Sequence, residues 1–359
     1  MKRLGKWWAT KRAALAGRRR FRSIAFVLRV RQVLVSAWSA SAVGLPSASR
    51  AVEAVTTGST GRPLALAGGG DPAGALGQVE PEWAAVEIGT REDGAPWRQR
   101  LHGTHVLVAG VTGAGKGSVV WGIIRKLLPA VAAGLVEIWA CDPKRMELSF
   151  GRALFNQYAS EPERMVDLLE RAAAEMQKRA DAFAGRLRTH TPSPGCPFVL
   201  VVVDELAFLT AYQPDRDLRR RAEAAIATLT SQGRSVGFCV LGALQDPRKE
   251  VMNIRNLFPD RVALRLDEAG QVDMVLGAGA RARGALADLI SSDPRTGAGV
   301  GYVRSDSSPD PVRVRAAYVP DSEITALVAE YCPDDSVYTV SSPLYAVPHP
   351  TPPEGAPNP

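Results

Sequence analysis

Short apolar runs alternate with longer amphipathic stretches through the middle of the chain. A continuous apolar run such as Phe198–Val203 is typical of the centre of a parallel sheet, where both faces of a strand are buried. Strands are predicted over five such runs, at residues 105–109, 135–141, 198–203, 236–241 and 261–266. Because helical patterns separate these runs, the alternation predicts an α/β domain of three layers.

Two of the predicted helices have recognisable ends. The first covers Lys116–Leu128 and should stop before Pro129, because proline lacks the amide proton that the next turn needs. The second covers Ser160–Leu187, where apolar residues recur at three- and four-residue steps. At its start, Ser160 and Glu163 have the spacing of a capping box.

Charge is unevenly distributed along the 359 residues. The formal net charge is +7, but residues 1–50 hold twelve of the 44 Lys and Arg residues and no acidic residue. The remaining 32 basic and 37 acidic residues give a net charge of −5. The high pI therefore belongs to the N-terminal part, and it is no argument that the rest of the chain binds nucleic acid.

Composition divides the chain into four parts. Residues 1–50 form a basic arm, and residues 51–80, rich in Gly, Ala, Ser and Thr, form a flexible linker. A globular domain is predicted over residues 81–332, and a Pro-rich, disordered tail over residues 333–359. The domain opens with a short β element over residues 81–100.

The sequence of the basic arm is compatible with three roles. Arg22, Arg29 and Arg31 interrupt its apolar stretch, so no membrane-spanning helix is predicted. The arm could lie on the inner face of the cell membrane, touch DNA phosphates or stay solvated. Four cysteines without a CxxC pair, and histidines that do not cluster with them, indicate a cytoplasmic protein without a zinc site.

A glycine-rich loop follows the first predicted strand. It reads Gly110-Val111-Thr112-Gly113-Ala114-Gly115-Lys116-Gly117-Ser118, which has the spacing G-x4-G-K between a strand and a helix. The glycines let backbone amides curl around a β-phosphate, while Lys116 and the helix N-terminus attract its negative charge. The loop therefore predicts that the chain binds ATP.

The residue after the lysine departs from this pattern. A Ser or Thr hydroxyl coordinates Mg²⁺ there in P-loops, but this chain has Gly117, with Ser118 one residue later. One helical step turns a side chain by about 100°, so Ser118 does not simply replace the missing group. Ser118 stays a candidate metal ligand: either the loop geometry shifts, or water fills the vacant ligand position.

A pair of carboxylates follows the apolar run that ends at residue 203. Asp204 is predicted to hold the magnesium-bound water, and Glu205 to polarise the attacking water as general base. An adjacent Glu favours hydrolysis of ATP over phosphoryl transfer to a small molecule. Gln245 ends the next predicted strand, where its side chain can contact the γ-phosphate or that water.

Together these motifs resemble the FtsK/SpoIIIE family of DNA-pumping ATPases over roughly residues 85–320. The stretch Asp142-Pro143-Lys144-Arg145-Met146-Glu147-Leu148 resembles the family's D-P-K-x-x-E-L sequence. Further likenesses are Gly233-Arg234-Ser235-Val236-Gly237 with Gln245-Asp246-Pro247-Arg248, and Pro259-Asp260-Arg261-Val262-Ala263. The glycine loop and residues 276–284 look most like actinomycete plasmid transfer proteins.

The resemblance implies a P-loop NTPase (RecA-like) domain with a mainly parallel sheet. It places Asp142 and Lys144 at the nucleotide and implies ATP with Mg²⁺, with no further small-molecule substrate. It also implies double-stranded DNA as the cargo of a homohexamer, in which Arg234 or Arg261 is donated across the subunit interface. Arg281 and Arg283 lie in a loop that could face the DNA.

Two features point from chromosome segregation toward plasmid or conjugative transfer. The family's chromosomal members carry several membrane helices and a C-terminal DNA-reading module, and neither is expected in this sequence. Two alternatives stay open. Type VII secretion ATPases share this motor fold but resemble D-F-K at residues 142–144. A nucleotide-binding regulatory protein without turnover would explain Gly117 but leave Glu205 without a task.

Overall fold

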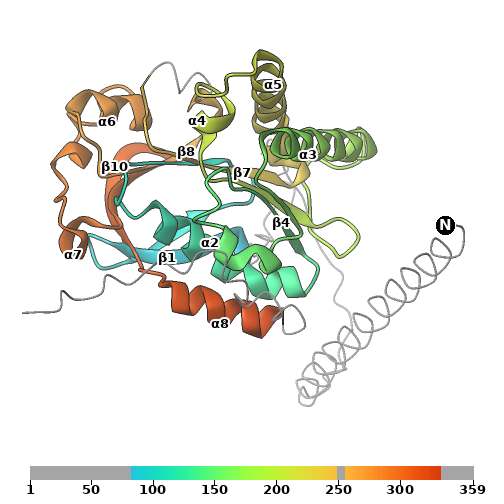
Figure 1. Cartoon of the computed structure of the whole chain (residues 1–359), viewed down its shortest axis with the longest axis horizontal. Coiled ribbons are helices and arrows are strands. Elements are labelled where there is room, and N and C mark those ends of the chain that lie inside the picture. The colour runs from blue at the N-terminus through green and yellow to red at the C-terminus, as the bar shows by residue number, and fades with distance from the viewer. Residues whose placement is uncertain (1–81, 249–254, 333–359) are drawn as a thin grey trace, which may run out of the picture. The chain divides into compact units, whose positions relative to one another are not determined.

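The computed structural model describes residues 82–248 and 255–332 of the chain (Figure 1). The predicted arm (1–50), linker (51–80) and tail (333–359) lie outside the described residues, so the predictions made for them stay predictions. None of the helices in the described ranges combines the length and the apolar character that crossing a membrane requires.

One ten-stranded sheet runs through the described residues in the order β2-β1-β10-β9-β8-β3-β7-β6-β4-β5. Its parallel part consists of β8 (Asp260–Leu264), β3 (Val106–Ala109), β7 (Phe238–Leu244), β6 (Phe198–Val203), β4 (Val136–Cys141) and β5 (Gln157–Ala159). Antiparallel pairs add β9 (Val300–Ser305), β10 (Ser308–Ala316), β1 (Ala85–Arg91) and β2 (Pro96–Arg100). The predicted α/β fold with a mainly parallel sheet is confirmed.

Helices cover both faces of this sheet (Figure 1). On one face lie α3 (Pro162–Phe183), α4 (Leu206–Leu209), α5 (Arg216–Gln232) and α6 (Ala269–Leu276); on the other lie α2 (Lys116–Ala132) and α8 (Asp321–Tyr331). Shorter helical turns are η1 (Glu82–Ala84), η2 (Ser149–Leu154), η3 (Gly233–Val236), η4 (Arg255–Leu257), η5 (Ala287–Leu289) and α7 (Pro294–Gly297).

The central strand β6 shows why the fold has three layers. Val199, Val201 and Val203 belong to the core beneath α3 and α5, whereas Leu200 and Val202 belong to the core beneath α2. All six residues of β6 are buried. A strand buried on both faces needs apolar residues at every position, which is the uninterrupted pattern of its sequence.

All five predicted strands occur, four of them with shifted ends. The largest shift is at β7, which begins at Phe238 rather than at Val236 and continues to Leu244. The delay has a physical cause, because Val236 lies in η3 and Gly237 then turns the chain with a φ of 80°.

Pro129 does not end helix α2, contrary to the prediction. The helix continues to Ala132, and Gly134, with a φ of 72°, follows it. Leu127, Leu128 and Ala130 are buried around the proline, so packing holds this last turn. Near a helix end the missing amide costs one hydrogen bond, which this burial offsets.

The capping box predicted at Ser160 and Glu163 is also wrong. Helix α3 begins at Pro162, and its N-cap is Glu161, whose side chain makes no capping hydrogen bond. Proline is well suited to the first helical position because its φ is already helical, and this places the cap one residue after Ser160. At the other end, α3 stops at Phe183, and Leu187 is 58% exposed beyond it.

Candidate nucleotide-binding site

The predicted site residues follow parallel strands at one edge of the sheet. Ala109, the last residue of β3, pairs with Leu244 of β7, and Cys141 of β4 pairs with Val203 of β6. The next residues along the chain are therefore brought to the same edge: Gly110, Gln245, Asp142 and Asp204. Ligands of open α/β sheets bind at this carboxyl edge of the strands.

The glycine loop joins β3 to α2 through two left-handed residues. Gly113 has a φ of 74° and Gly115 a φ of 93°, and Gly115 is the N-cap of α2 without any side-chain capping bond. The first amides of the helix are thus left for an anion. A backbone bond of 2.9 Å from Gly299 to the carbonyl of Ala114 braces the loop against the start of β9.

Replacing Gly115 by Ala should destabilise the fold more than replacing Gly113 by Ala. Both residues are left-handed, which costs an alanine about 1–2 kcal/mol. A Cβ at residue 115 would also lie 2.4 Å from the amide nitrogen of Gly299, whereas one at residue 113 meets nothing within 4 Å. That collision adds about 1–3 kcal/mol. Equal losses in denaturant unfolding of the two variants would contradict this account.

Lys116 lies folded inside the loop. Its Nζ donates hydrogen bonds to the carbonyls of Gly110 at 2.6 Å and Val111 at 3.2 Å. Burial lowers the pKa of Lys116 to about 8, although the nearby Glu205 carboxylate acts in the opposite direction. The ammonium group therefore occupies the hollow of the loop. The charged oxygens of a bound β-phosphate would replace those carbonyls as acceptors of its hydrogen bonds.

Glu205 is held from two sides. It is 5% exposed, its Oε2 is 3.0 Å from Nζ of Lys144, and its Oε1 accepts a 3.4 Å hydrogen bond from the amide of Gln245. The side chain of Gln245 lies 3.5 Å from the hydroxyl of Thr112 in the glycine loop. The structure thus brings together the predicted base, Lys144, Gln245 and the loop.

Asp204 is buried among other carboxylates. It is 8% exposed, and burial, followed by the charges of Glu147 and Asp142, raises the pKa of Asp204 to about 7. Hard cations such as Mg²⁺ take carboxylate oxygens, and a cation would relieve this repulsion, so the residues fit Mg²⁺. Within the described ranges, no three His, Cys, Asp or Glu side chains form a ready-made metal site.

Asp142 organises the loop that follows β4. It is fully buried, its Oδ1 accepts the amide of Arg145 at 2.8 Å, and its Oδ2 accepts the amide of Leu148 at 3.2 Å and the Tyr158 hydroxyl at 3.1 Å. These bonds fix the segment that carries Lys144 and Glu147. Direct contact between Asp142 and a nucleotide, like metal binding by Ser118, stays a prediction.

The two candidate arginines lie at the opposite edge of the sheet, before β7 and at the start of β8. Arg234 is half-exposed and lies 3.5 Å from Asp306. Arg261 is 7% exposed and donates hydrogen bonds to the carbonyls of Phe258 and Val275. Neither is at this chain's own nucleotide site, and a role across an interface stays a prediction for both.

The basic loop near residue 280 is tied to its own chain. Arg281 makes an ion pair of 2.9 Å with Asp288, and Arg283 donates hydrogen bonds to the carbonyls of Ala278 and Pro309. These bonds shape the loop and already satisfy part of each guanidinium. Contact with DNA at either arginine stays a prediction.

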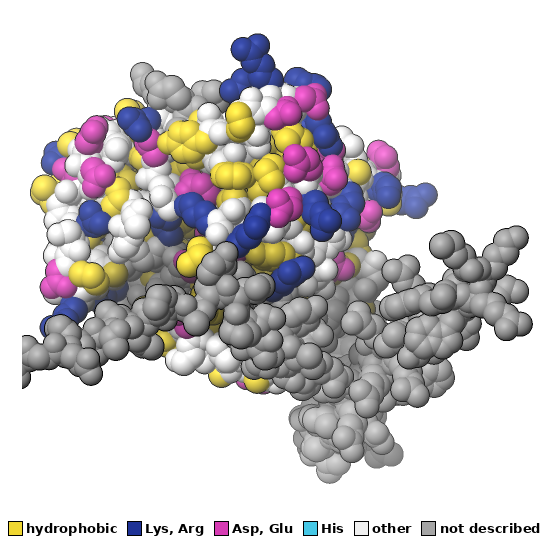
Figure 2. Space-filling model, in the orientation of Figure 1, with side chains coloured by type: hydrophobic (Ala, Val, Ile, Leu, Met, Phe, Trp, Pro, Cys, Tyr) yellow, Lys and Arg dark blue, Asp and Glu magenta, His cyan; other side chains and the backbone are white. Residues whose placement is uncertain are grey.

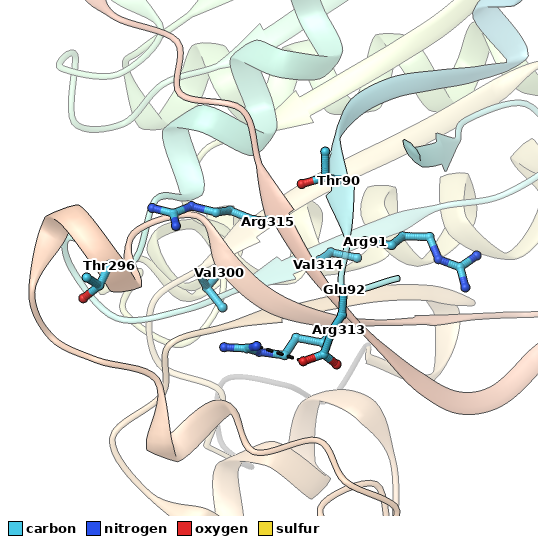
Figure 3. Close-up of a pocket in the computed structure, with 8 residues that line it drawn as sticks. All are labelled: Thr90, Arg91, Glu92, Thr296, Val300, Arg313, Val314 and Arg315. Carbon is cyan, nitrogen blue, oxygen red and sulfur yellow. Dashed lines mark hydrogen bonds and ion pairs between the residues drawn. The ribbon is translucent and has the colours of Figure 1, made fainter. Parts of the chain in front are cut away.

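A separate hollow lies on the antiparallel side of the sheet, away from the carboxylate pair. It is lined by Thr90, Arg91, Glu92, Thr296, Val300, Arg313, Val314 and Arg315 (Figure 3). Its arginines have partners within the chain: Arg313 pairs with Glu92 at 3.0 Å, Arg91 pairs with Asp93 at 2.8 Å, and Arg315 donates to the carbonyl of Arg295. Two of the three arginines are thus paired with acids, and the guanidinium of Arg315 is bound to a backbone carbonyl.

Comparison with known proteins supports the family resemblance. The FtsK/SpoIIIE family model matches residues 78–193. The resemblance to FtsK/SpoIIIE proteins is confirmed. The DNA translocase FtsK of Oceanobacillus iheyensis is 26% identical over 249 residues, which are 64% of this chain and 30% of that protein. The chain thus spans about 30% of the length of the FtsK relatives that it matches.

Two solved structures share the fold of this FtsK/SpoIIIE-like chain. The pCW3 conjugation coupling protein TcpA, in a monomer form with ATPγS, has a TM-score of 0.55 and 21% identity, covering 70% of this chain and 71% of that one. The cytoplasmic domain of the type VII secretion ATPase EccC of Thermomonospora curvata has a TM-score of 0.53 and 21% identity, covering 73% and 32%. These likenesses confirm the P-loop ATPase fold.

Proposed function

We propose that this chain hydrolyses ATP to move double-stranded DNA, in plasmid or conjugative transfer. The observation that carries the proposal is the position of Glu205, a buried carboxylate held by Lys144 and the amide of Gln245 at the same sheet edge as the glycine loop. A regulatory protein that only binds nucleotide needs no buried base there. The FtsK and TcpA relatives, a DNA translocase and a conjugation coupling protein by name, support DNA as the cargo.

The chain's own groups divide the work of hydrolysis. Lys116 leaves the carbonyls of its loop to bind the phosphates, and the free amides at the start of α2 bind them from the other side. Glu205 accepts a proton from the attacking water, which requires Lys144 to release the carboxylate or to share it. Asp204, which is buried, would help to hold Mg²⁺, and the metal would neutralise charge on the phosphates.

Assembly and DNA contact belong to the same proposal. We infer a homohexamer with nucleotides between subunits, and of the two arginines Arg234 suits donation across an interface, because Arg261 would first have to leave its buried bonds. Figure 2 shows basic and acidic side chains interspersed on the visible face. A DNA path is therefore expected to be local, such as the lining of a ring. We place the protein in the cytoplasm, with the basic arm as a candidate for contact with the membrane's inner face.

Duplex DNA should stimulate ATP turnover by roughly tenfold, which corresponds to about 1.4 kcal/mol of activation free energy. The full chain should also displace the third strand from a triplex, and Lys116→Ala should do neither, since its phosphate-binding charge is lost. Triplex displacement by Lys116→Ala at the wild-type rate would overturn the motor. The fold alone is shared with EccC. Turnover that ignores DNA but rises with a small helical secretion substrate would therefore favour protein transport.

A further inference from the structure

The missing side chain at residue 117 leaves a space that Glu147 fills. A Cβ built on Gly117 would lie 2.1 Å from Oε1 of Glu147, 2.7 Å from its Cδ and 2.9 Å from its Oε2. All three distances are shorter than any real Cβ contact. The carboxylate group of Glu147 therefore occupies the place where a Ser or Thr side chain would begin.

Two bonds hold Glu147 in this place. The indole nitrogen of Trp121, on helix α2, donates a 3.2 Å hydrogen bond to the backbone carbonyl of Glu147. The next amide, that of Leu148, is bound by Asp142 at 3.2 Å, and the Leu148 side chain is fully buried. The backbone on both sides of Glu147 is thus anchored, and the anchors come from the helix of the glycine loop and from the end of β4.

The carboxylate itself has no partner in the described ranges of the chain: no hydrogen bond or ion pair there involves its oxygens. Burial raises the pKa of Glu147, with Asp142 and Asp321 adding to the effect, while Lys116 and Lys144 oppose it. Glu147 is also the largest charge contribution to the raised pKa of Asp204. An anchored carboxylate near Asp204 and the glycine loop, with no ion pair in the described ranges, offers its oxygens to a cation.

We propose that a carboxylate oxygen of Glu147 is the magnesium ligand that replaces the hydroxyl expected at residue 117. This deepens the proposed function and rests on it, because the metal is the Mg²⁺ that accompanies ATP. Gly117 and Glu147 form a linked pair: the glycine makes room, and the carboxylate supplies the oxygen. Carboxylate oxygens are suitable Mg²⁺ ligands, and one beside the P-loop can bind a metal that phosphates also hold.

A carboxylate in place of a neutral hydroxyl should change how ATP affinity depends on Mg²⁺. The added negative charge repels the phosphates until a cation is bound. ATP binding by this chain should therefore depend on Mg²⁺ more strongly than binding at a P-loop with a hydroxyl. Removing the charge should reduce the benefit of Mg²⁺ without weakening the binding of metal-free ATP.

The test is binding of a fluorescent ATP analogue to the full chain, with Mg²⁺ and with EDTA. In Glu147→Gln, which keeps the size of the side chain, the gain in affinity from Mg²⁺ should fall about 10–100-fold, while affinity in EDTA is unchanged or higher. The matched control is Glu163→Gln, an exposed acid in the first turn of α3, which should keep the wild-type gain. Binding of Mn²⁺, which replaces Mg²⁺ here, can be measured by electron paramagnetic resonance. It should be weaker in Glu147→Gln and unchanged in Glu163→Gln.

A second variant separates metal binding from folding. In Gly117→Ser the new side chain should push the Glu147 carboxylate aside, because the atoms it meets are the far end of that flexible side chain. Gly117→Ser combined with Glu147→Ala restores a hydroxyl in a vacated space and should recover part of the Mg²⁺-dependent affinity that Glu147→Ala loses. A wild-type gain in Glu147→Gln, or an equal loss of affinity in Mg²⁺ and EDTA, would overturn the metal role and leave ATP binding standing. Failure of the unmodified chain to bind ATP under either condition would instead overturn the proposed function.

Discussion

Glu205→Gln should bind ATP as tightly as the unmodified chain and hydrolyse it about a thousandfold more slowly, because a general base contributes about 10²–10⁴-fold to such rates. The amide keeps the size of the carboxylate and can still accept the hydrogen bond from the Gln245 amide, but it cannot take a proton from water. Single-turnover hydrolysis and equilibrium binding of ATP, measured on the same preparation, check both halves of the expectation. Lys116→Ala should differ by losing the binding as well.

The control for this experiment is a Glu whose charge lies away from the sheet edge. Glu175→Gln suits it, since Glu175 is on α3 and its carboxylate is 3.5 Å from the ammonium of Lys178 on the surface. That variant should hydrolyse ATP at the wild-type rate. If Glu205→Gln did so too, the base would be another group. If ATP affinity fell in parallel with the rate, Glu205 would serve to hold the loop rather than to activate water.

The ion pair between Lys144 and Glu205 links the segment after β4 to the base at the end of β6. Asp142 orders that segment through two hydrogen bonds to its amides, and Glu147 lies in the same segment beside Gly117. A displacement of the segment would therefore move Lys144 and Glu147 together. One short stretch thus carries side chains that reach both the predicted base and the space at residue 117.

Local patterns were enough to predict five of the six parallel strands, and only the short β5 (Gln157–Ala159) was not predicted. The strand over Phe198–Val203 could be predicted to the residue because a strand buried on both faces must be apolar throughout. The glycine loop and Asp204 with Glu205 could be found because their spacing lies within a few residues of such strands. These features need no knowledge of what packs against them.

The antiparallel half could be predicted only in part: the short β element over residues 81–100 occurs as β1 and β2, whereas no strand was predicted for β9 or β10. Strand β10 reads Ser308-Pro309-Asp310-Pro311 before its apolar positions begin, and most of its residues are partly exposed. It pairs with β9 on one side and on the other with β1, which lies more than 200 residues earlier in the chain. Such a strand exists because of distant partners, and its own sequence lacks the continuous apolar run that marks β6.

The candidate site likewise combines features that the local sequence predicts with features that it does not. The unusual glycine at residue 117 is visible in the sequence, but its consequence is not, because Glu147 is 30 residues away and reaches Gly117 only through the end of β4. Sequence reasoning named Glu147 as part of a motif and gave it no role. A signal existed in principle, since a glycine in place of a side chain leaves room that some other group must fill.

Asp204→Asn should stabilise the fold at pH 8 while impairing the use of Mg²⁺-ATP. The pKa of Asp204 is raised from 3.8 to about 7 in the folded chain, so its ionised form opposes folding. Each unit of difference between the two pKa values lowers the free energy of unfolding by about 1.4 kcal/mol where the group is ionised. Relaxation of the surroundings reduces the total, so the expected gain for Asp204→Asn at pH 8 is about 1–3 kcal/mol.

The destabilisation of the fold by ionised Asp204 depends on pH in a definite direction. The opposition to folding is absent below about pH 4, where Asp204 is protonated in both states; it grows as the pH rises to about 7 and is complete above that. Denaturant unfolding at pH 8, 6 and 4.5 should therefore show a gain that shrinks with falling pH. Asp181→Asn, an exposed acid at the end of α3, should show no such trend. A loss of stability for Asp204→Asn at pH 8 would mean that the ionised carboxylate is already compensated in the metal-free chain, which would remove the electrostatic reason for a cation at this site.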